Sequence, residues 1–331
     1  MDSLRAVAIF WVFFYHFFEF WTPSGHGMAL LPFGDAARGF PLFDVGHLGV
    51  SLFFIISGFV ILLTLQRTAS IIEFAVRRVA RLYPTLILCG TITFFVTSLF
   101  GPEQIRVGVS EFLLSILSLP PENVGTILGI SDWGWLDGSY WSLWVEIRYY
   151  AIFGLIFYMF RTNWLTVWLI FQAACLVLFL SFKFTGLGIL DSLGGLLIYQ
   201  FVPLFSVGMF AYLIYMKADG RSFTRIMLVL SVLHSFLVSM FSSSDPSANT
   251  SLILGNLVVF TLFFGALTSK PLQKALSFGP LVKIGQSSYS FYLLHQMIGL
   301  SLLHVMSPYI PGYILLFLGI PIILAILIVL S

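Results

Sequence analysis

The chain has 331 residues, of which 59% are hydrophobic and only 9% are charged, and its mean hydropathy is +1.00. A soluble domain carries about 25% charged residues, so composition excludes a water-facing globule and predicts an integral membrane protein. The net charge of +2 says little about partners, and because no basic block suggests nucleic acid we expect no nucleic-acid partner. Cys89 and Cys175 lie in apolar runs, which excludes a disulfide framework and a CxxC metal pair, and we expect no metal site.

Apolar windows of roughly 17–23 residues, each long enough for ~30 Å of hydrocarbon, recur along the whole chain. They predict an all-α, polytopic bundle of about ten transmembrane helices. We expect one membrane-embedded domain over 1–331, without an appended soluble domain. The predicted spans are 4–21, 49–66, 84–100, 141–160, 164–182, 194–216, 223–241, 251–269, 287–307 and 312–331.

Basic residues are distributed asymmetrically between the predicted loops. With both termini placed in the cytoplasm, twelve Lys and Arg residues lie inside, three lie outside (Arg38, Arg106 and Lys183), and Arg148 lies within a span. Because cytoplasmic loops are enriched in Lys and Arg, this distribution predicts ten spans with both termini inside. The stretch 109–119 is too short to cross and is predicted to lie along the outer surface.

The first predicted span contains three ionisable residues, which are costly in hydrocarbon. Arg5 and His16 differ by ~20° around an α-helix and by ~16 Å along it, so they share a face. Glu19 lies one turn beyond His16, where its carboxylate could contact the imidazole and fix its tautomer. Structural roles are the alternative: His16 bonded to a neighbouring helix and Arg5 anchoring the span.

Glycine and arginine mark the second span and the loop after it. Gly46, Gly49, Ser57 and Gly58 in "GHLGVSLFFIISGFVI" predict close approach between helices. The stretch "FAVRRVARLYP" places Arg77, Arg78 and Arg81 on one helical face, ended by Pro84 at the start of the third span. Such a face suits the phosphates of a cytoplasmic donor, although membrane anchoring explains three arginines equally well.

Two later spans also carry polar residues. In "YWSLWVEIRYY", Glu146 lies about two turns below the outer surface and requires a partner or a cavity, while Arg148 points to a different face. Trp141 fits an outer aromatic belt and could also stack on a sugar ring. His295 in "SSYSFYLLHQMIG" is either a substrate ligand or a packing histidine.

Five stretches occur in the order found in one known family: "DSLRAVAIFWVFFYHF", "GHLGVSLFFIISGFVI", "RRVARLYP", "YWSLWVEIRYY" and "SYSFYLLHQ". The chain therefore resembles the membrane-bound acyltransferase-three family, which includes bacterial O-antigen and exopolysaccharide O-acetylases. The first stretch has the family's Arg, ten residues, His spacing.

The resemblance implies transfer of an acyl group, commonly acetyl, from cytoplasmic acyl-coenzyme A to a hydroxyl of a cell-envelope glycan or glycolipid. It implies that Arg5 and His16 are essential, and that Arg78 and Arg81 form the family's Arg-x-x-Arg element. We expect acetyl-CoA or another acyl-CoA as donor, no permanently bound cofactor, membrane lipids as partners, and a multi-pass location in the cell inner (plasma) membrane.

The candidate catalytic residues are therefore His16, Glu19 and Glu146. The candidate donor-binding residues are Arg5, Arg77, Arg78 and Arg81, and the candidate acceptor-binding residues are Trp141 and His295. The competing hypothesis is a proton-coupled transporter or lipid-linked glycan flippase, in which His16, Glu19 and Glu146 would relay protons. A signalling or scaffold protein with purely structural polar contacts is a third hypothesis.

Overall fold

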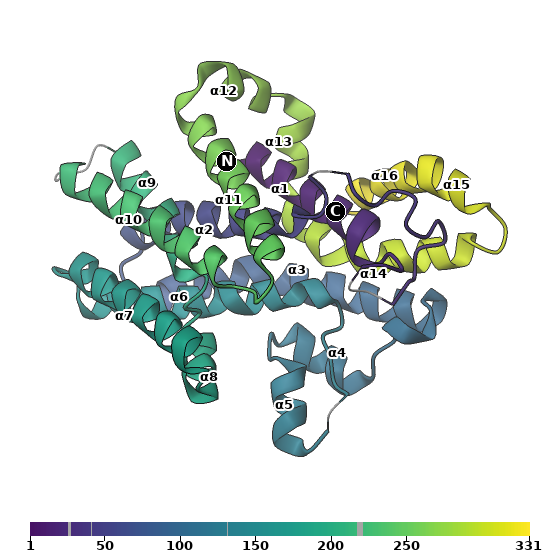
Figure 1. Ribbon diagram of the computed structural model, residues 1–331, viewed down its shortest axis with the longest axis horizontal. Helices are drawn as coiled ribbons and strands as arrows, with labels where there is room; N and C mark the ends of the chain where they lie inside the picture. Colours follow the sequence, from purple (N-terminus) through teal and green to yellow (C-terminus); the bar gives the residue numbers. More distant parts are fainter. Residues whose placement is uncertain (26–27, 41, 131, 217–220) are drawn as a thin grey trace. The chain divides into compact units, whose positions relative to one another are not determined.

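The computed structural model describes residues 1–331 except 26–27, 41, 131 and 217–220, and its regular structure there is entirely helical (Figure 1). Elements η2–η4 are 3₁₀ turns, and η1 and η5 are π-helical. In chain order the elements are α1 (Asp2–Tyr15), η1 (His16–Phe20), η2 (Gly46–Leu48), α2 (Gly49–Gln66), α3 (Ile71–Phe100), η3 (Glu103–Ile105), α4 (Val109–Ile116), α5 (Pro121–Leu128), η4 (Gly138–Tyr140), α6 (Trp141–Met159), α7 (Trp164–Thr185), α8 (Gly188–Leu196), α9 (Val202–Tyr215), α10 (Arg221–Met240), α11 (Pro246–Thr268), α12 (Lys270–Leu276), α13 (Gly279–Gln286), α14 (Ser288–Met306), α15 (Gly312–Ile314), η5 (Leu315–Gly319) and α16 (Ile320–Leu330).

Seven helical segments within the described residues are long and apolar enough to cross a membrane, and each overlaps a predicted span. They are Asp2–Phe20, Gly46–Gln66, Ile71–Phe100, Trp164–Thr185, Ser222–Met240, Pro246–Thr268 and Gly312–Leu330. The other three predicted spans correspond to α6, α14 and the interrupted pair α8 and α9. Ile198 separates that pair because its φ of 51° lies in the left-handed region. The 14 residues of α9 cover only about 21 Å.

The start of the third span differs from the sequence prediction. Pro84 was expected to begin a helix, but it lies inside α3, which is continuous from Ile71 to Phe100. A proline removes one backbone donor and still permits a helix to continue when neighbouring packing supports it. The arginine stretch and the apolar stretch after it are therefore parts of one helix.

The chain forms two compact units, and α2, α3, α6 and α11 each contribute residues to both. The first unit consists of Met1–Val50, Ala80–Trp144 and Phe263–Ser331, and the second consists of Ser51–Val79 and Val145–Leu262. In the first unit, α1 packs against α13, α14 and η2. Gly49 permits this packing, because a methyl group there would lie 2.4 Å from the carbonyl oxygen of Ala8.

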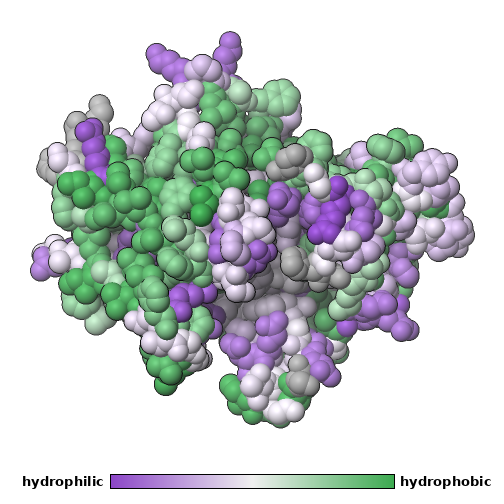
Figure 2. Space-filling model, viewed as in Figure 1, coloured by the Kyte–Doolittle hydropathy of each residue, from purple (hydrophilic) through white to green (hydrophobic). Residues whose placement is uncertain are grey.

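In the second unit, α9 contacts α7 and α10. Methyl groups on Gly58 and Gly208 would lie 2.0 Å and 1.9 Å from the carbonyl oxygens of Phe205 and Ile55. The close approach predicted from the small residues of the second span is thus confirmed. Figure 2 shows a largely hydrophobic surface over α10. Exposed apolar side chains on α10 include Ile226, Val229, Leu230 and Leu233, as expected for a surface that faces lipid.

Candidate functional site

The polar residues of the first helix occupy three different environments. In the first turn of α1, Nη1 of Arg5 donates a hydrogen bond of 2.8 Å to Asp2. At its other end the helix continues as the π turn His16–Phe20. His16 is half-buried there, whereas the Glu19 side chain is buried. Short π segments often mark functional positions. The candidate site therefore lies around this turn.

His16 lies beside a second histidine, His295 of α14, which is fully buried. Nδ1 of His295 lies 2.8 Å from the carbonyl oxygen of Tyr292, and Nδ1 of His16 lies 3.0 Å from that of Val12. A carbonyl only accepts, so each Nδ1 carries the proton. The His16 Nδ1–H also points to Nε2 of His295, 3.0 Å away. Both rings are therefore Nδ1–H tautomers, and Nε2 of His16 keeps its lone pair.

Gln296, next to His295, contacts that lone pair. With the carboxamide oriented so that every neighbour is satisfied, its nitrogen donates to Oδ1 of Asp137 at 3.0 Å and to Nε2 of His16 at 3.3 Å. Its oxygen accepts from the indole N–H of Trp21 at 3.1 Å. Residues from η1, from the position directly after it and from the segment before η4 thus converge on one amide group of α14.

Asp137 is fully buried in the first unit, at the start of η4. Its Oδ1 accepts from the backbone N–H and the hydroxyl of Ser139 at 2.8 Å and 2.6 Å, and its Oδ2 accepts from the Met297 N–H at 3.4 Å. Burial raises the pKa of Asp137 to about 6, while these hydrogen bonds oppose the shift. Both oxygens of this carboxyl group thus accept hydrogen bonds, and Oδ1 can also accept from Gln296.

Glu19 does not hold His16, which corrects the sequence prediction. Its carboxylate instead accepts from Nε of Arg38 at 3.1 Å and from the backbone N–H of Gly39 at 2.8 Å. The π turn explains the difference, because its hydrogen bonds close from residue i to i+5 and shift the side chains relative to α-helical spacing. Glu19 secures the segment after the first span, and the tautomer of His16 is set by Val12 and α14.

Glu146 lies in the second unit, where its described partners are hydroxyl groups. Its carboxylate accepts from Oγ of Ser57 at 2.5 Å and from the hydroxyl of Tyr150, one turn further along α6. Arg148 points elsewhere, as the sequence predicted, and donates to the carbonyl oxygen of Gly195. Glu146 thus has the internal partners that a carboxylate within a membrane helix requires.

The arginines of α3 are not equivalent. Arg77 is exposed and pairs with Glu73 at 2.7 Å, and Arg81 is exposed. Arg78 is half-buried and donates to Oγ1 of Thr64 at 3.0 Å. Its guanidinium also lies 5.8 Å and 5.6 Å from the ring centroids of Phe74 and Tyr150. Arg78 is therefore held in place from two directions, whereas Arg77 and Arg81 extend to the surface.

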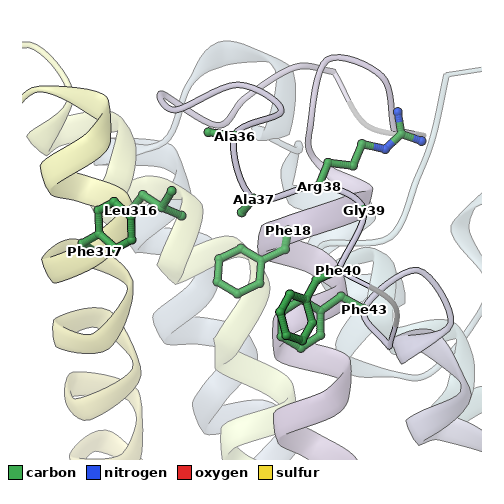
Figure 3. A pocket seen from close by; sticks show the side chains of 9 residues that line it. All are labelled: Phe18, Ala36, Ala37, Arg38, Gly39, Phe40, Phe43, Leu316 and Phe317. Carbon is green, nitrogen blue, oxygen red and sulfur yellow. The ribbon is translucent and has the colours of Figure 1, made fainter.

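An apolar pocket of about 410 Å³ lies beside the π turn. Figure 3 shows Phe18, Phe40 and Phe43 on one side and residues of η5 on the other, while the Arg38 guanidinium points away. Aromatic and aliphatic side chains make up most of its lining. It is lined by Phe18, Ala36, Ala37, Arg38, Gly39, Phe40, Phe43, Leu316 and Phe317.

Sequence reasoning found both histidines but did not predict their contact, and it missed Gln296 and Asp137. The signals were weak: Gln296 directly follows His295, and Asp137 appeared only as an acidic residue of a tryptophan-rich loop. Trp141, expected at the acceptor, is exposed at the start of α6. Across the described ranges, no three His, Cys, Asp or Glu side chains are grouped as metal ligands.

Comparison with known proteins places this chain in a family. The chain is 25% identical to the O-acetyltransferase OatA of Staphylococcus aureus, over 95% of this chain and 52% of the relative. It is 27% identical to the O-acetyl transferase of Shigella phage Sf6, over 34% of this chain and 35% of the relative. The chain thus spans about half the length of the Staphylococcus relative, and no solved structure matches it. The acyltransferase-three model, described as an acyltransferase domain, matches residues 1–331, so this multi-pass membrane chain belongs to the acyltransferase-three family.

Proposed function

We propose that the protein is an integral membrane O-acyltransferase that moves an acetyl group from cytoplasmic acetyl-CoA, or another acyl-CoA, to a hydroxyl of a cell-envelope glycan or glycolipid. The observation that carries the proposal is the half-buried imidazole of His16, whose Nε2 lone pair is free of a proton within a chain of this family. The relatives named for O-acetyl transfer support acetyl as the group that is moved.

In the proposed reaction His16 is the general base. Its Nε2 takes the proton of the acceptor hydroxyl while that oxygen attacks the thioester carbon. The carbon–sulfur bond then breaks, the acyl group remains on the acceptor oxygen, and the coenzyme A thiolate receives the proton from His16. In the alternative route, Nε2 itself attacks the thioester carbon, the carbon–sulfur bond breaks and the coenzyme A thiolate leaves. The acceptor hydroxyl then attacks the acyl group, the bond from that group to Nε2 breaks, and the hydroxyl proton neutralises the thiolate.

The donor side is proposed to be cytoplasmic. Ten spans with both termini inside would place Arg77, Arg78 and Arg81 on that side of the plasma membrane, where guanidinium groups can bind the phosphates of coenzyme A. Arg78 is the best candidate among them, because its position is fixed by Thr64 and two aromatic rings. Arg5 is proposed to help place the pantetheine arm.

The test uses purified protein in liposomes with acetyl-labelled acetyl-CoA and an envelope glycolipid extract. Label should move to the glycolipid with the unchanged protein and with His304→Ala, but not with His16→Ala. His304 is the matched control, because it is an exposed histidine near the end of α14. Equal transfer by His16→Ala and the unchanged protein would refute the assigned role.

The acceptor is identified by comparing cell-surface glycans from a deletion strain with those from its parent by mass spectrometry. Loss of an acetyl increment from one glycan, restored by the intact gene and not by His16→Ala, would identify the acceptor. Movement of a glycolipid across the liposome membrane without acylation would favour the transporter or flippase hypothesis instead.

A further inference from the structure

We propose that Gln296 is a positioning residue for acyl transfer: held by Asp137 and Trp21, its carboxamide keeps His16 in the Nδ1–H tautomer and presents the Nε2 lone pair to the reacting groups. This inference deepens the proposed function and rests on it. It assigns one role to three buried polar side chains that no sequence motif connected.

The direction of the amide follows from its neighbours. Oδ1 of Asp137 accepts from the N–H and hydroxyl of Ser139, the indole N–H of Trp21 only donates, and the amide nitrogen and oxygen face them accordingly. In the reverse orientation the amide oxygen would face two acceptors, and the amide nitrogen would face an N–H. A buried polar group left without its hydrogen bonds is destabilising, so Asp137 and Trp21 together fix which atom reaches His16.

The opposite side of the imidazole points to the same tautomer. The Nδ1–H of His16 donates toward the carbonyl oxygen of Val12 and toward Nε2 of His295. Gln296 offers an N–H, not an acceptor, to Nε2. A proton on Nε2 would therefore face a donor, and both sides of the ring disfavour it.

The bond from Gln296 to His16 is suited to being displaced. Its length of 3.3 Å exceeds the usual range of about 2.7–3.2 Å, whereas the bond that anchors Gln296 to Asp137 measures 3.0 Å. His16 is half-buried, while Gln296 and Asp137 are almost fully buried. An incoming hydroxyl or thioester can thus replace the weak bond while the amide stays anchored.

The decisive variant exchanges the two partners: Asp137→Asn together with Gln296→Glu. The new amide at position 137 donates to the new carboxylate at 296, so this hydrogen bond and the net charge are kept. The amide nitrogen takes the place of Oδ1, so the Ser139 N–H loses its acceptor. Trp21 still donates to the carboxylate. His16, however, now faces an acceptor, which stabilises the doubly protonated imidazolium and removes the lone pair.

At pH 7 the double variant should transfer acetyl at least about 100-fold more slowly than the unchanged protein, since loss of a general base costs about 10²–10⁴-fold. Its KM for acetyl-CoA should change little and its rate should recover toward high pH, whereas its melting temperature should fall because the Ser139 N–H loses its acceptor. A double variant with the rate and pH profile of the unchanged protein would overturn the inference.

A second measurement needs neither donor nor acceptor. Diethyl pyrocarbonate acylates unprotonated imidazole, and peptide mass spectrometry reads the label on each histidine. At pH 7, His16 should react more slowly in the double variant, with the difference disappearing by about pH 9, while exposed His304 reacts equally in both. Equal labelling of His16 at pH 7, or an unreactive His16 in the unchanged protein, would overturn the inference. If the labelling differs but the unchanged protein transfers no acetyl, the proposed function fails and the tautomer assignment stands.

Discussion

Two substitutions of His295 separate its contact with His16 from its contribution to packing. His295→Gln can place a carboxamide oxygen near the position of Nε2, where it accepts from the Nδ1–H of His16. His295→Asn can place an amide nitrogen near the position of Nδ1, where it donates to the carbonyl oxygen of Tyr292 but does not reach His16. Both variants lose the stacked imidazole face on Phe291, so they form a matched pair.

The expected magnitude follows from the number of bonds lost. His16 keeps the carbonyl oxygen of Val12 as a partner in both variants, and His295→Asn removes only one neutral hydrogen bond. Such a bond contributes about 1 kcal/mol, which corresponds to an approximately fivefold lower kcat. His295→Gln should remain close to the unchanged rate, far from the loss of about 100-fold or more expected for His16→Ala.

The assay is acetyl transfer in liposomes at saturating acetyl-CoA, with thermal unfolding of the same preparations in detergent. The two variants should have similar melting temperatures and different kcat values. Equal rates for both variants, or a faster Asn variant, would contradict the role assigned to the His16–His295 contact.

Three further predictions concern stability and the corrected role of Glu19. Gly208→Ala should lower the free energy of unfolding by about 1–3 kcal/mol through overpacking, seen as a lower melting temperature. Gly195→Ala, whose new carbon meets no atom within 4 Å, should not lower it. Glu19→Gln keeps an acceptor for the Gly39 N–H and should leave kcat nearly unchanged; a large loss of kcat in a stable variant would restore the sequence-based role. Asp137 has a pKa raised from 3.8 to about 6, so the folded state binds its proton more tightly than the unfolded chain. The free energy of unfolding should therefore fall by about 2 kcal/mol between pH 4 and pH 6, with a total fall of about 3 kcal/mol that is complete about one pH unit above 6, and Asp137→Asn should remove this dependence in unfolding scans.

Features that depend on the length and composition of a single segment could be predicted from the sequence. Apolar length alone located the seven candidate spans, because each must be long enough for the hydrocarbon thickness. The small residues of the second span correctly indicated close packing, since Gly49 and Gly58 meet backbone oxygens of neighbouring helices. The interruption at Ile198 was missed. A β-branched residue rarely adopts the left-handed backbone conformation seen there, so local sequence preference does not predict it.

The candidate site depends on contacts between residues far apart in the sequence, and the spacing of residues along one helix does not predict such contacts. His16 and His295 are separated by 279 positions, so helix packing brings them together. The expected pairing of His16 with Glu19 assumed α-helical geometry, and the π turn at this position removes that assumption. Asp137 and Gln296 carry no motif, and only burial around one amide reveals their common partner.

The three ionisable residues of the first helix are distinguished by their partners. Arg5 pairs with Asp2, and Glu19 pairs with Arg38, so both charges are balanced by charges of opposite sign. The described partners of His16 are all neutral: a backbone carbonyl, a second imidazole and an amide. A carboxylate partner would stabilise the protonated ring, whereas neutral partners leave the imidazole uncharged within an apolar helix. Of the three residues, His16 is therefore the one whose surroundings preserve a lone pair for chemistry.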